Sequence, residues 1–175
     1  MQLQTPARLQ SFPSVTSVVR AGADRVDELE PLWRALYDHH AVVGRGAAPV
    51  RDFADTWRRR RAQYEQWLAA GEAVLLLAQR EGRALGYAMV RPVPGAATWD
   101  LGERGLEIET LSVAPDERGA GVGHALIEAA AEFGRELGAQ FMDVGLVYTN
   151  EGAYRFYERE GFRRFYVSMV RQLST

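Results

Sequence analysis

The sequence predicts a single α/β domain in which helices cover both faces of a mixed sheet. Three observations lead to this prediction. Apolar, β-branched runs typical of strands alternate with segments whose apolar residues recur at helical spacing. A glycine-rich turn joins one such run to a helical segment, and another strand-like run follows it. A β-turn-α-β unit of this kind forms a right-handed crossover between parallel strands. The expected order of elements is β-α-α-β-β-β-α-β-α-β.

The first expected elements are a strand and a long helical segment. The β-branched run at 14–22 ends in a turn signal, which predicts a strand. Apolar residues at helical spacing predict a helix within 23–43, with Asp24 as its N-cap. Pro31 lies inside this pattern and is expected to split or kink the helix.

A second helix and a β-hairpin follow. Helical spacing over 51–71 predicts a helix that begins at Asp52 and stops at Gly71. Two apolar runs, at 73–78 and 85–93, flank a short turn that contains glycine. This pattern predicts a pair of antiparallel strands.

The second half of the chain opens with a glycine-rich connection. The elements expected after it are a strand at 106–115, a helix that ends at Leu137, a strand at 139–149, a helix at 150–161 and a closing strand at 162–173. The closing run is aromatic and β-branched, as strands commonly are.

The strand before the glycine-rich turn does not alternate regularly. Its apolar residues Ile108, Leu111 and Val113 are spaced by three and then two positions. Because side chains alternate between faces with period two, one extra residue near Glu109 or Thr110 is needed to place all three on one face. We therefore predict a bulged, splayed central strand. An extended ligand that contains amides can pair with the backbone groups left open there.

The glycine-rich turn, residues 118–123, leads directly into a helix. The unpaired amides and positive dipole end of a helix N-terminus attract anions, and glycine lets a phosphate approach closely. A P-loop does not fit because His124 stands where that motif has lysine, and the glycine spacing does not fit a dinucleotide fold. A tight structural connection remains the alternative to a phosphate or pyrophosphate site.

Composition excludes several classes of function. The chain of 175 residues has no cysteine, and its three histidines predict no metal site. A formal net charge of −2 argues against nucleic-acid binding, and no apolar run is long enough to span a membrane. Residues 1–13 do not resemble a secretory signal and are expected to be a flexible lead-in to one domain at 14–175. We therefore expect a cytoplasmic protein.

Two motifs in the second half of the chain resemble a known family. IETLSVAPDERGAGVGHALIEAA and the later NEGAYRFYEREGF are similar to the GCN5-related N-acetyltransferase (GNAT) superfamily, whose acetyl-CoA signature is Arg/Gln-x-x-Gly-x-Gly/Ala. The matching residues are Arg118, Gly121 and Gly123 in the signature, Leu111, Val113 and Pro115 before it, and Asn150, Ala153, Phe156, Tyr157, Gly161 and Phe162 after it. The resemblance covers about 107–162 and implies a GNAT-like fold for the domain.

The resemblance implies acetyl-CoA as co-substrate. Amides of the turn and of the first helical residues would bind the CoA pyrophosphate, and the bulged strand would pair with the pantetheine amides. Asp116 and Glu117 depart from what anion binding favours. The implied cofactor-binding residues are Leu111, Ser112, Val113, Arg118, Gly119, Ala120, Gly121, Val122, Gly123, His124, Asn150 and Tyr157.

The implied reaction moves an acetyl group to a primary amine, which needs a base for the amine and an acid for the departing thiolate. Glu109 and Glu107 match the family's positions for the base, with Glu109 preferred and two solvated strand carboxylates as the alternative. Tyr157 matches the proton donor to sulfur, with core packing as the alternative. Because no nucleophile for an acetyl-enzyme is evident, we expect direct attack in a ternary complex.

The expected acceptor is a small-molecule amine. A peptide or protein amine is the second possibility, and a non-catalytic acyl-CoA-binding regulatory module is the third. In this superfamily the two helices after the first strand cover the acceptor pocket, which implies Tyr37, His40 and Trp57 as substrate contacts, with packing as the alternative. Arg58–Arg61 is interpreted as the polar face of a helix, with a contact to an acidic acceptor or to a CoA phosphate as the alternative. The closing strand is interpreted as an edge that could form a homodimer.

Overall fold

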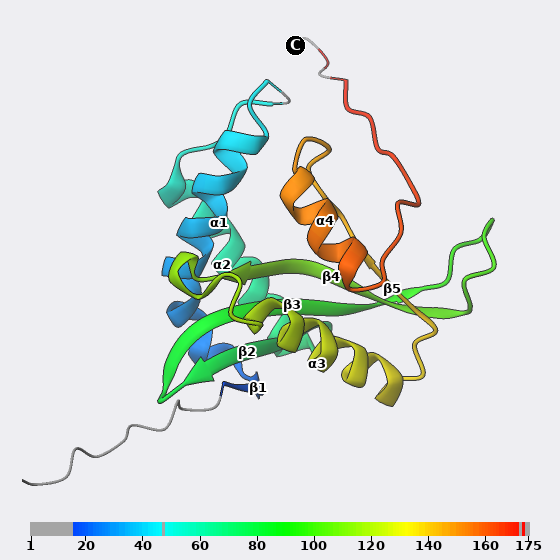
Figure 1. The fold of residues 1–175 in the computed structure, drawn as a ribbon, viewed down its shortest axis with the longest axis horizontal. Helices are drawn as coiled ribbons and strands as arrows, with labels where there is room; N and C mark the ends of the chain where they lie inside the picture. Colours follow the sequence, from blue (N-terminus) through cyan, green and yellow to red (C-terminus); the bar gives the residue numbers. More distant parts are fainter. Residues whose placement is uncertain (1–15, 47, 172, 174–175) are drawn as a thin grey trace, which may run out of the picture.

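The computed structural model describes residues 16–46, 48–171 and 173, so the lead-in expected at 1–13 lies outside the described part. One sheet has the strand order β1-β2-β3-β4-β5, antiparallel throughout except for the parallel pair β4 and β5 (Figure 1). This arrangement confirms the mixed α/β class. The strands are β1 (Ser17–Ala21), β2 (Val74–Arg80), β3 (Arg83–Pro94), β4 (Arg104–Val113) and β5 (Phe141–Val144). The helices are α1 (Glu30–Val43), α2 (Phe53–Ala70), α3 (Val122–Glu136) and α4 (Glu151–Arg159), with short 3-10 helices η1 (Ala23–Leu29) and η2 (Pro115–Glu117).

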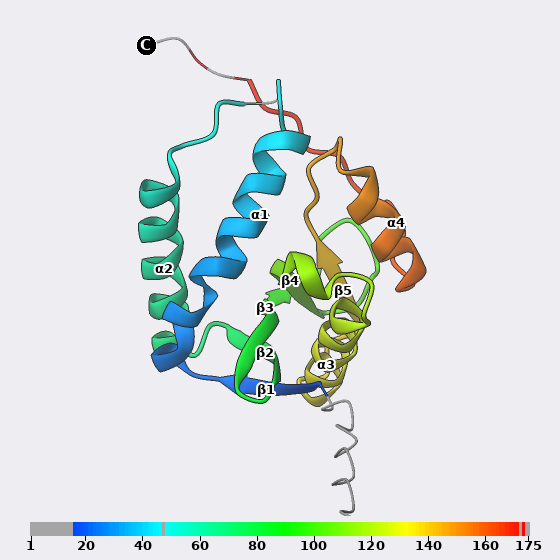
Figure 2. The ribbon, with the colours of Figure 1, turned by 60° about the vertical axis from the view of Figure 1, so that its left-hand side comes forward.

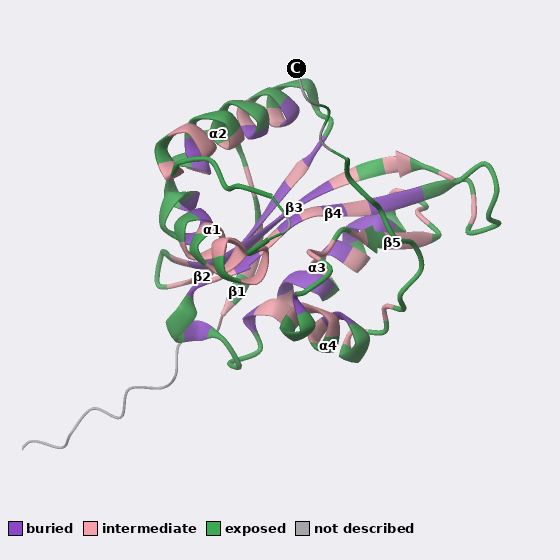
Figure 3. Ribbon diagram, turned by 90° about the horizontal axis from the view of Figure 1, so that it is seen from above, coloured by how far each residue is buried: buried purple, intermediate pink, exposed green. Residues whose placement is uncertain are grey.

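Helices lie on both sides of the sheet: α1 and α2 on one side, α3 and α4 on the other (Figure 2). Because strand side chains alternate, Leu75 and Leu77 pack toward α1 and α2 while Leu76 and Ala78 pack toward α3. Burial is concentrated along the central strands and on the inward faces of the helices (Figure 3). Within the described ranges no helix is both long and apolar enough to cross a bilayer.

Several element ends lie where local sequence signals predict them. Asp52 caps α2 by accepting a hydrogen bond from the Asp55 amide at 3.0 Å, and Gly71 ends that helix with a left-handed φ of 69°. Asn150 caps α4 in the same way, accepting from the Ala153 amide at 3.1 Å. These caps orient two helices that border the site described below.

The segment at 23–43 is not a single α-helix. Its first part is the 3-10 helix η1, and α1 begins one residue before Pro31. The prediction that Asp24 caps the helix is wrong, since Gly22 holds the cap position of η1. Proline has no backbone N–H to donate, so it is accommodated in the first turn of a helix but not in its interior. The predicted split therefore occurs, with α1 beginning at Glu30, one residue before the proline.

The predicted bulge in β4 is confirmed. The register of β4 against β3 shifts by one at Glu109, which is the extra residue. As a result Ile108, Leu111 and Val113 all pack in the layer of α3. β5 pairs with β4 only as far as Ile108, opposite Val144, so the second half of β4 has no partner on that side within the sheet.

The predicted closing strand is wrong for the described residues of that run. No strand is present at 162–171 or at 173, and this segment leaves the end of α4 and runs away from the sheet (Figure 1). Phe162 packs against the core, but the large apolar side chains from Phe165 to Val170 are exposed, from 59% for Phe165 to 91% for Met169. Strand propensity reflects packing on a paired and partly buried surface, and this run has no ladder partner in the described chain.

Candidate active site

A cavity of about 640 Å³ opens where β4 and β5 separate. The bulged half of β4 forms one wall, the N-terminal end of α3 and the turn before it form another, and residues of α1 and α4 complete the lining. Most of the site residues predicted from the sequence therefore border one cavity. They are His40, Glu109, Leu111, Ser112, Val113, Arg118, Gly119, Gly121, Gly123, His124, Asn150 and Tyr157.

The glycine-rich turn presents open backbone to this cavity. Gly119 and Gly121 have φ values of 79° and 85°, a left-handed conformation that glycine adopts without steric cost. No atom lies within 4 Å of where a Cβ would sit at either residue. α3 begins at Val122 without a side-chain cap, and the first amides of a helix have no partner within it. The turn therefore has the chemistry of an anion site.

Gly123 has a different structural reason. A Cβ at this position would lie 3.1 Å from the ring of Phe156, so its absence allows α3 and α4 to approach closely. The Phe156 ring in turn contacts the ring of Tyr157, with 5.0 Å between centroids. The last glycine of the motif thus places α4 and its tyrosine beside the turn.

The two acids before the turn are paired with arginines of the β2–β3 hairpin. Arg83 donates to Asp116 at 2.6 Å, and this hydrogen bond lowers the pKa of the exposed Asp116 carboxyl. Arg80 donates to Glu117 at 3.0 Å, and the Glu117 side chain is buried. These ion pairs offset the negative charge next to the anion site.

The open edge of β4 is held in place from the α1 side. The Ser112 hydroxyl is buried and donates to the Leu32 carbonyl at 2.8 Å, which ties the strand to α1. The Val113 carbonyl accepts a hydrogen bond from Arg118 Nε at 3.4 Å. The Ser112 side chain therefore serves the fold, and what this strand offers a ligand is its backbone.

Glu109, the bulge residue, faces α2 across the cavity. Arg60 Nη1 donates to Glu109 Oε1 at 2.5 Å, and both side chains are about one quarter exposed. The next residue, Thr110, faces the same helix, accepting a hydrogen bond from the Tyr64 hydroxyl at 2.7 Å. Because the bulge turns two consecutive side chains toward α2, an acid and a hydroxyl meet the same helix.

Glu107 lies outside the cavity lining. It is in register with Asp143 of β5, and burial raises the pKa of Glu107, with the charges of Glu109 and Asp143 raising it further. Burial also raises the pKa of Asp143. The two candidate bases therefore stand in different surroundings: Glu109 is paired with a guanidinium in the cavity, and Glu107 lies between Asp143 of β5 and Arg91 of β3.

Tyr157 is buried in α4 and borders the cavity. Its ring packs between Phe156 and Phe162, with centroids 5.0 Å and 5.3 Å away. Burial raises the pKa of the phenol above its usual value of 10.0. At neutral pH this side chain therefore retains a proton that it can donate.

Residues 32–162 match the family described as "Acetyltransferase (GNAT) family". This protein belongs to the GNAT acetyltransferase family. A mycothiol acetyltransferase of Propionibacterium freudenreichii subsp. shermanii is 35% identical over 140 residues, which are 79% of this chain and 40% of that protein. An uncharacterized N-acetyltransferase of Archaeoglobus fulgidus is 31% identical over 119 residues, 66% of this chain and 78% of that protein. The GNAT chain thus spans about two fifths of the length of the mycothiol acetyltransferase that it matches.

Solved structures share the fold at low sequence identity. An aminoglycoside N-acetyltransferase, AAC(6')-Iy in complex with CoA, superimposes with a TM-score of 0.75 at 18% identity, covering 95% of this chain and 100% of that chain. A ribosomal-protein-alanine N-acetyltransferase from Brucella melitensis biovar Abortus 2308 has a TM-score of 0.66 at 19% identity, covering 91% and 100%. At these identities the likeness establishes the GNAT fold and not the acceptor.

Some residues singled out in the sequence lie outside the lining of the GNAT cavity. Tyr37 donates to the Arg51 carbonyl at 2.8 Å, and Trp57 is buried in the core between the helices and the sheet. Val122 is buried, and Ala120 also lies outside the lining. Of the three residues proposed as substrate contacts only His40 borders the cavity, and burial lowers its pKa, with the charges of His39 and Arg60 lowering it further.

Arg60 is the one arginine of the run Arg58–Arg61 that lines the cavity, and the sequence interpretation did not single it out from that group. It lies three positions after Trp57 and four before Tyr64, both of which are buried. That spacing places Arg60 on the inward face of α2 and was a usable signal. His39, whose Nε2 lies 3.3 Å from Asn150 Oδ1, also borders the cavity from α1.

Proposed function

We propose that this protein is an acetyl-CoA-dependent N-acetyltransferase that acetylates a primary amine of a small molecule by direct attack in a ternary complex. The observation that carries the proposal is one cavity that joins a glycine turn at a helix N-terminus, a bulged strand with one open edge, a carboxylate and a buried phenol. The mycothiol acetyltransferase among the relatives supports a small acceptor.

The residues around the cavity fit the chemical groups of acetyl-CoA. Amides of residues 119–124 and the dipole of α3 suit a pyrophosphate, and the open backbone at 111–113 suits the amides of pantetheine. Asn150 would contact CoA from the start of α4. Acetyl-CoA would supply the acetyl group as a thioester, already activated for transfer to an amine.

The proposed chemistry assigns one proton transfer to each of two side chains. The acceptor reacts as the neutral amine: its nitrogen bonds to the acetyl carbon as the carbon–sulfur bond breaks, and Glu109 takes the proton that the nitrogen then loses, directly or through water. Tyr157 donates its proton to the departing sulfur and regains one from solvent. Glu107 is also a candidate for the base, since it lies on the same strand. It ranks second to Glu109 because it lies outside the lining of the cavity.

No metal takes part in the proposed steps. Within the described ranges, no three His, Asp or Glu side chains gather as a possible metal site. The proposal also places the enzyme in the cytoplasm, where acetyl-CoA is made.

The test is CoA release, measured with a thiol-reactive dye, in the presence of acetyl-CoA and a panel of amines. A chain without cysteine contributes no background to this assay. We expect amine-dependent release that falls at least about 100-fold in kcat for Tyr157→Phe and for Glu109→Gln. CoA affinity, measured by calorimetry, should stay within about threefold of wild type in both variants if their role is chemical.

Other outcomes of this assay contradict the proposal. Tight CoA binding without release for any small amine, but with release for peptides, would indicate a peptide acceptor. CoA binding without release in either case would indicate a non-catalytic module. An acetylated protein trapped after incubation with acetyl-CoA alone would contradict direct attack.

We also propose that the protein is a homodimer that buries the segment at 162–171 against a second copy. This run is aromatic and β-branched, and its side chains from Phe165 to Val170 include five large apolar groups that are more than half exposed. An exposed apolar run of this kind is typical of an interaction surface. Light scattering at micromolar concentration should give twice the mass of one chain, and the mass of a monomer would contradict the proposal.

A further inference from the structure

Arg60 has no task in the reaction proposed above, although it lies in the acceptor end of the cavity. Its three arginine neighbours on α2 have exposed ion pairs: Arg58 and Arg59 pair with Asp55, and Arg61 pairs with Asp27 and Glu65. Arg60 instead pairs with Glu109, the candidate base, at 2.5 Å. The side chain is therefore distinguished from the polar face of the helix by both its partner and its place.

Aromatic rings hold the Arg60 guanidinium in position. Its carbon lies 4.8 Å from the ring centroid of Trp33 and 5.5 Å from that of Tyr64, within the range of cation–π contacts. Gln63 accepts a further hydrogen bond from Nη1 at 3.1 Å. A planar guanidinium carries five donors and can hold a carboxylate through two hydrogen bonds, so its chemistry is that of a carboxylate receptor. In the structure the carboxylate that it holds is that of Glu109.

The charges at this end of the cavity do not suit a polycation. The end where we place the acceptor is the part of the lining that α1 and α2 contribute, namely Trp33, Leu36, His39, His40 and Arg60, together with Glu109 of β4. It offers one carboxylate, which is already paired, and one fixed positive charge. An amine without a carboxylate can bind Glu109 only if it displaces the Arg60 guanidinium. The guanidinium is then left in the cavity without a partner, and an unpaired charge there costs free energy.

A zwitterionic acceptor removes this cost. We propose that the acceptor carries a carboxylate near its amine, as an α-amino acid does, and that Arg60 binds this carboxylate while the amine faces Glu109. This inference deepens the proposed acetyltransferase function and rests on it. Binding exchanges one internal ion pair for two pairs with the ligand, and it releases Glu109 to accept the proton of the amine. Arg60 is then the specificity-determining residue of the acceptor site.

The test compares amino acids with their α-amides, which keep the side chain and the amine but have no carboxylate. CoA release is measured for a panel of both, with putrescine as a polyamine. Wild type should prefer the acids by about tenfold or more in kcat/KM, the range of a charged hydrogen bond. In Arg60→Gln the preference should disappear, because KM should rise much more for the acids than for the amides. Arg60→Lys keeps the charge but not the planar fork, and it should retain part of the preference.

Arg59→Gln is the matched control, since Arg59 is a neighbouring, exposed arginine paired with Asp55 outside the cavity. It should keep the preference of wild type. Calorimetric titration of an amino acid into the enzyme–CoA complex gives a readout independent of turnover, and the heat of binding should be lost in Arg60→Gln but not in Arg59→Gln.

The outcomes separate this inference from the proposed function. Efficient transfer to amides or to putrescine by wild type would overturn the inference and leave the acetyltransferase intact. An Arg60→Gln enzyme that keeps the wild-type preference for acids would also overturn the inference. An equal rise in KM for acids and amides would overturn it too, because Arg60 would then have a purely structural role. Absence of transfer to every amine, with CoA bound, would overturn the proposed function itself and the inference with it.

Discussion

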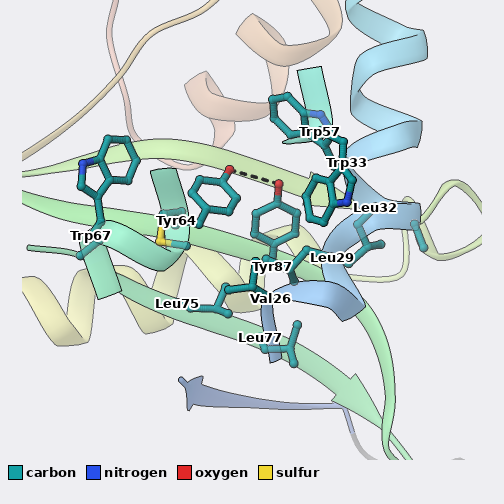
Figure 4. Close-up of a cluster of buried hydrophobic side chains, with 13 residues drawn as sticks. Val26, Leu29, Leu32, Trp33, Trp57, Tyr64, Trp67, Leu75, Leu77 and Tyr87 are labelled. Atoms are coloured by element: carbon teal, nitrogen blue, oxygen red, sulfur yellow. Dashed lines mark hydrogen bonds between the residues drawn. The ribbon is translucent and has the colours of Figure 1, made fainter. Parts of the chain in front are cut away.

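The Tyr64 hydroxyl is the central group of a buried polar network behind the bulge. It donates to Thr110 Oγ1 at 2.7 Å and lies 3.3 Å from the Tyr87 hydroxyl (Figure 4). Both tyrosines are fully buried and Thr110 is nearly so. Because Tyr64 uses its one proton toward Thr110, Tyr87 has to donate to Tyr64. We predict that Tyr64→Phe destabilises the protein much more than Tyr87→Phe does.

The magnitudes follow from which groups each change leaves unpaired. Tyr64→Phe removes the acceptor of Tyr87 and the donor to Thr110, and leaving two buried polar groups unsatisfied costs roughly 2 to 3 kcal/mol. Tyr87→Phe removes one long hydrogen bond and leaves the bond from Tyr64 to Thr110 intact, at a cost of about 0.5 to 1 kcal/mol. In the double variant Tyr64→Phe/Tyr87→Phe, the Tyr87 hydroxyl that the first change leaves unpaired is also removed. The double variant should therefore be no less stable than Tyr64→Phe alone.

Urea unfolding followed by circular dichroism measures the three free energies of unfolding, provided that fluorescence reports the same transition. The melting temperature of Tyr64→Phe should fall by about 4 to 12 °C for a chain of this size. Two results would refute the reasoning. One is a Tyr87→Phe variant as unstable as Tyr64→Phe, and the other is a double variant whose loss equals the sum of the single losses.

Two further predictions concern the strand and the α3–α4 contact. Folding raises the pKa of Glu107, so its charge lowers stability at neutral pH, and this penalty vanishes as the pH falls below the usual value of 4.5. Glu107→Gln should raise the melting temperature at neutral pH and not in acid, and an equal shift at both would contradict this account. Gly123→Val drives a side chain into Phe156 and should cost about 1 to 3 kcal/mol of stability. It should also weaken CoA binding, and calorimetry that finds wild-type affinity would argue against that contact as a support of the site.

The parts of the fold that could be predicted depend on neighbours in the sequence. The caps at Asp52 and Asn150 satisfy amides two or three residues away, so residue type and position suffice to find them. The bulge was equally accessible, because the step of three between Ile108 and Leu111 is incompatible with regular alternation. Signals from residues close together in the sequence were therefore enough to predict most helices and strands and the bulge in β4.

The parts that could not be predicted depend on partners far away in the chain. The run from Phe165 to Val170 has the composition of a strand, but pairing requires an edge to accept it, and propensity carries no information about that edge. The place of Arg60 in the cavity depends on how α2 lies across β4, which brings it to a carboxylate 49 positions later. The helical spacing of Arg60 places it on the inward face of α2. That its partner is the Glu109 carboxylate becomes evident only from the packing of α2 against β4.

The single extra residue in β4 explains why fold and site coincide in this chain. If β4 kept Glu109 but paired without a bulge, regular alternation would turn Leu111 and Val113 toward α2 and take Thr110 away from Tyr64, so the core and the polar network would both be lost. With the extra residue, the apolar side chains remain in the layer of α3, while the residue itself carries a carboxylate to the mouth of the cavity. The same insertion ends the pairing with β5 and leaves backbone groups open for a ligand. The acid that we assign to catalysis is therefore also the residue that creates the opening. A change of its side chain should lower turnover, whereas its deletion should remove the bulge while Thr110, Leu111 and Val113 keep their present faces.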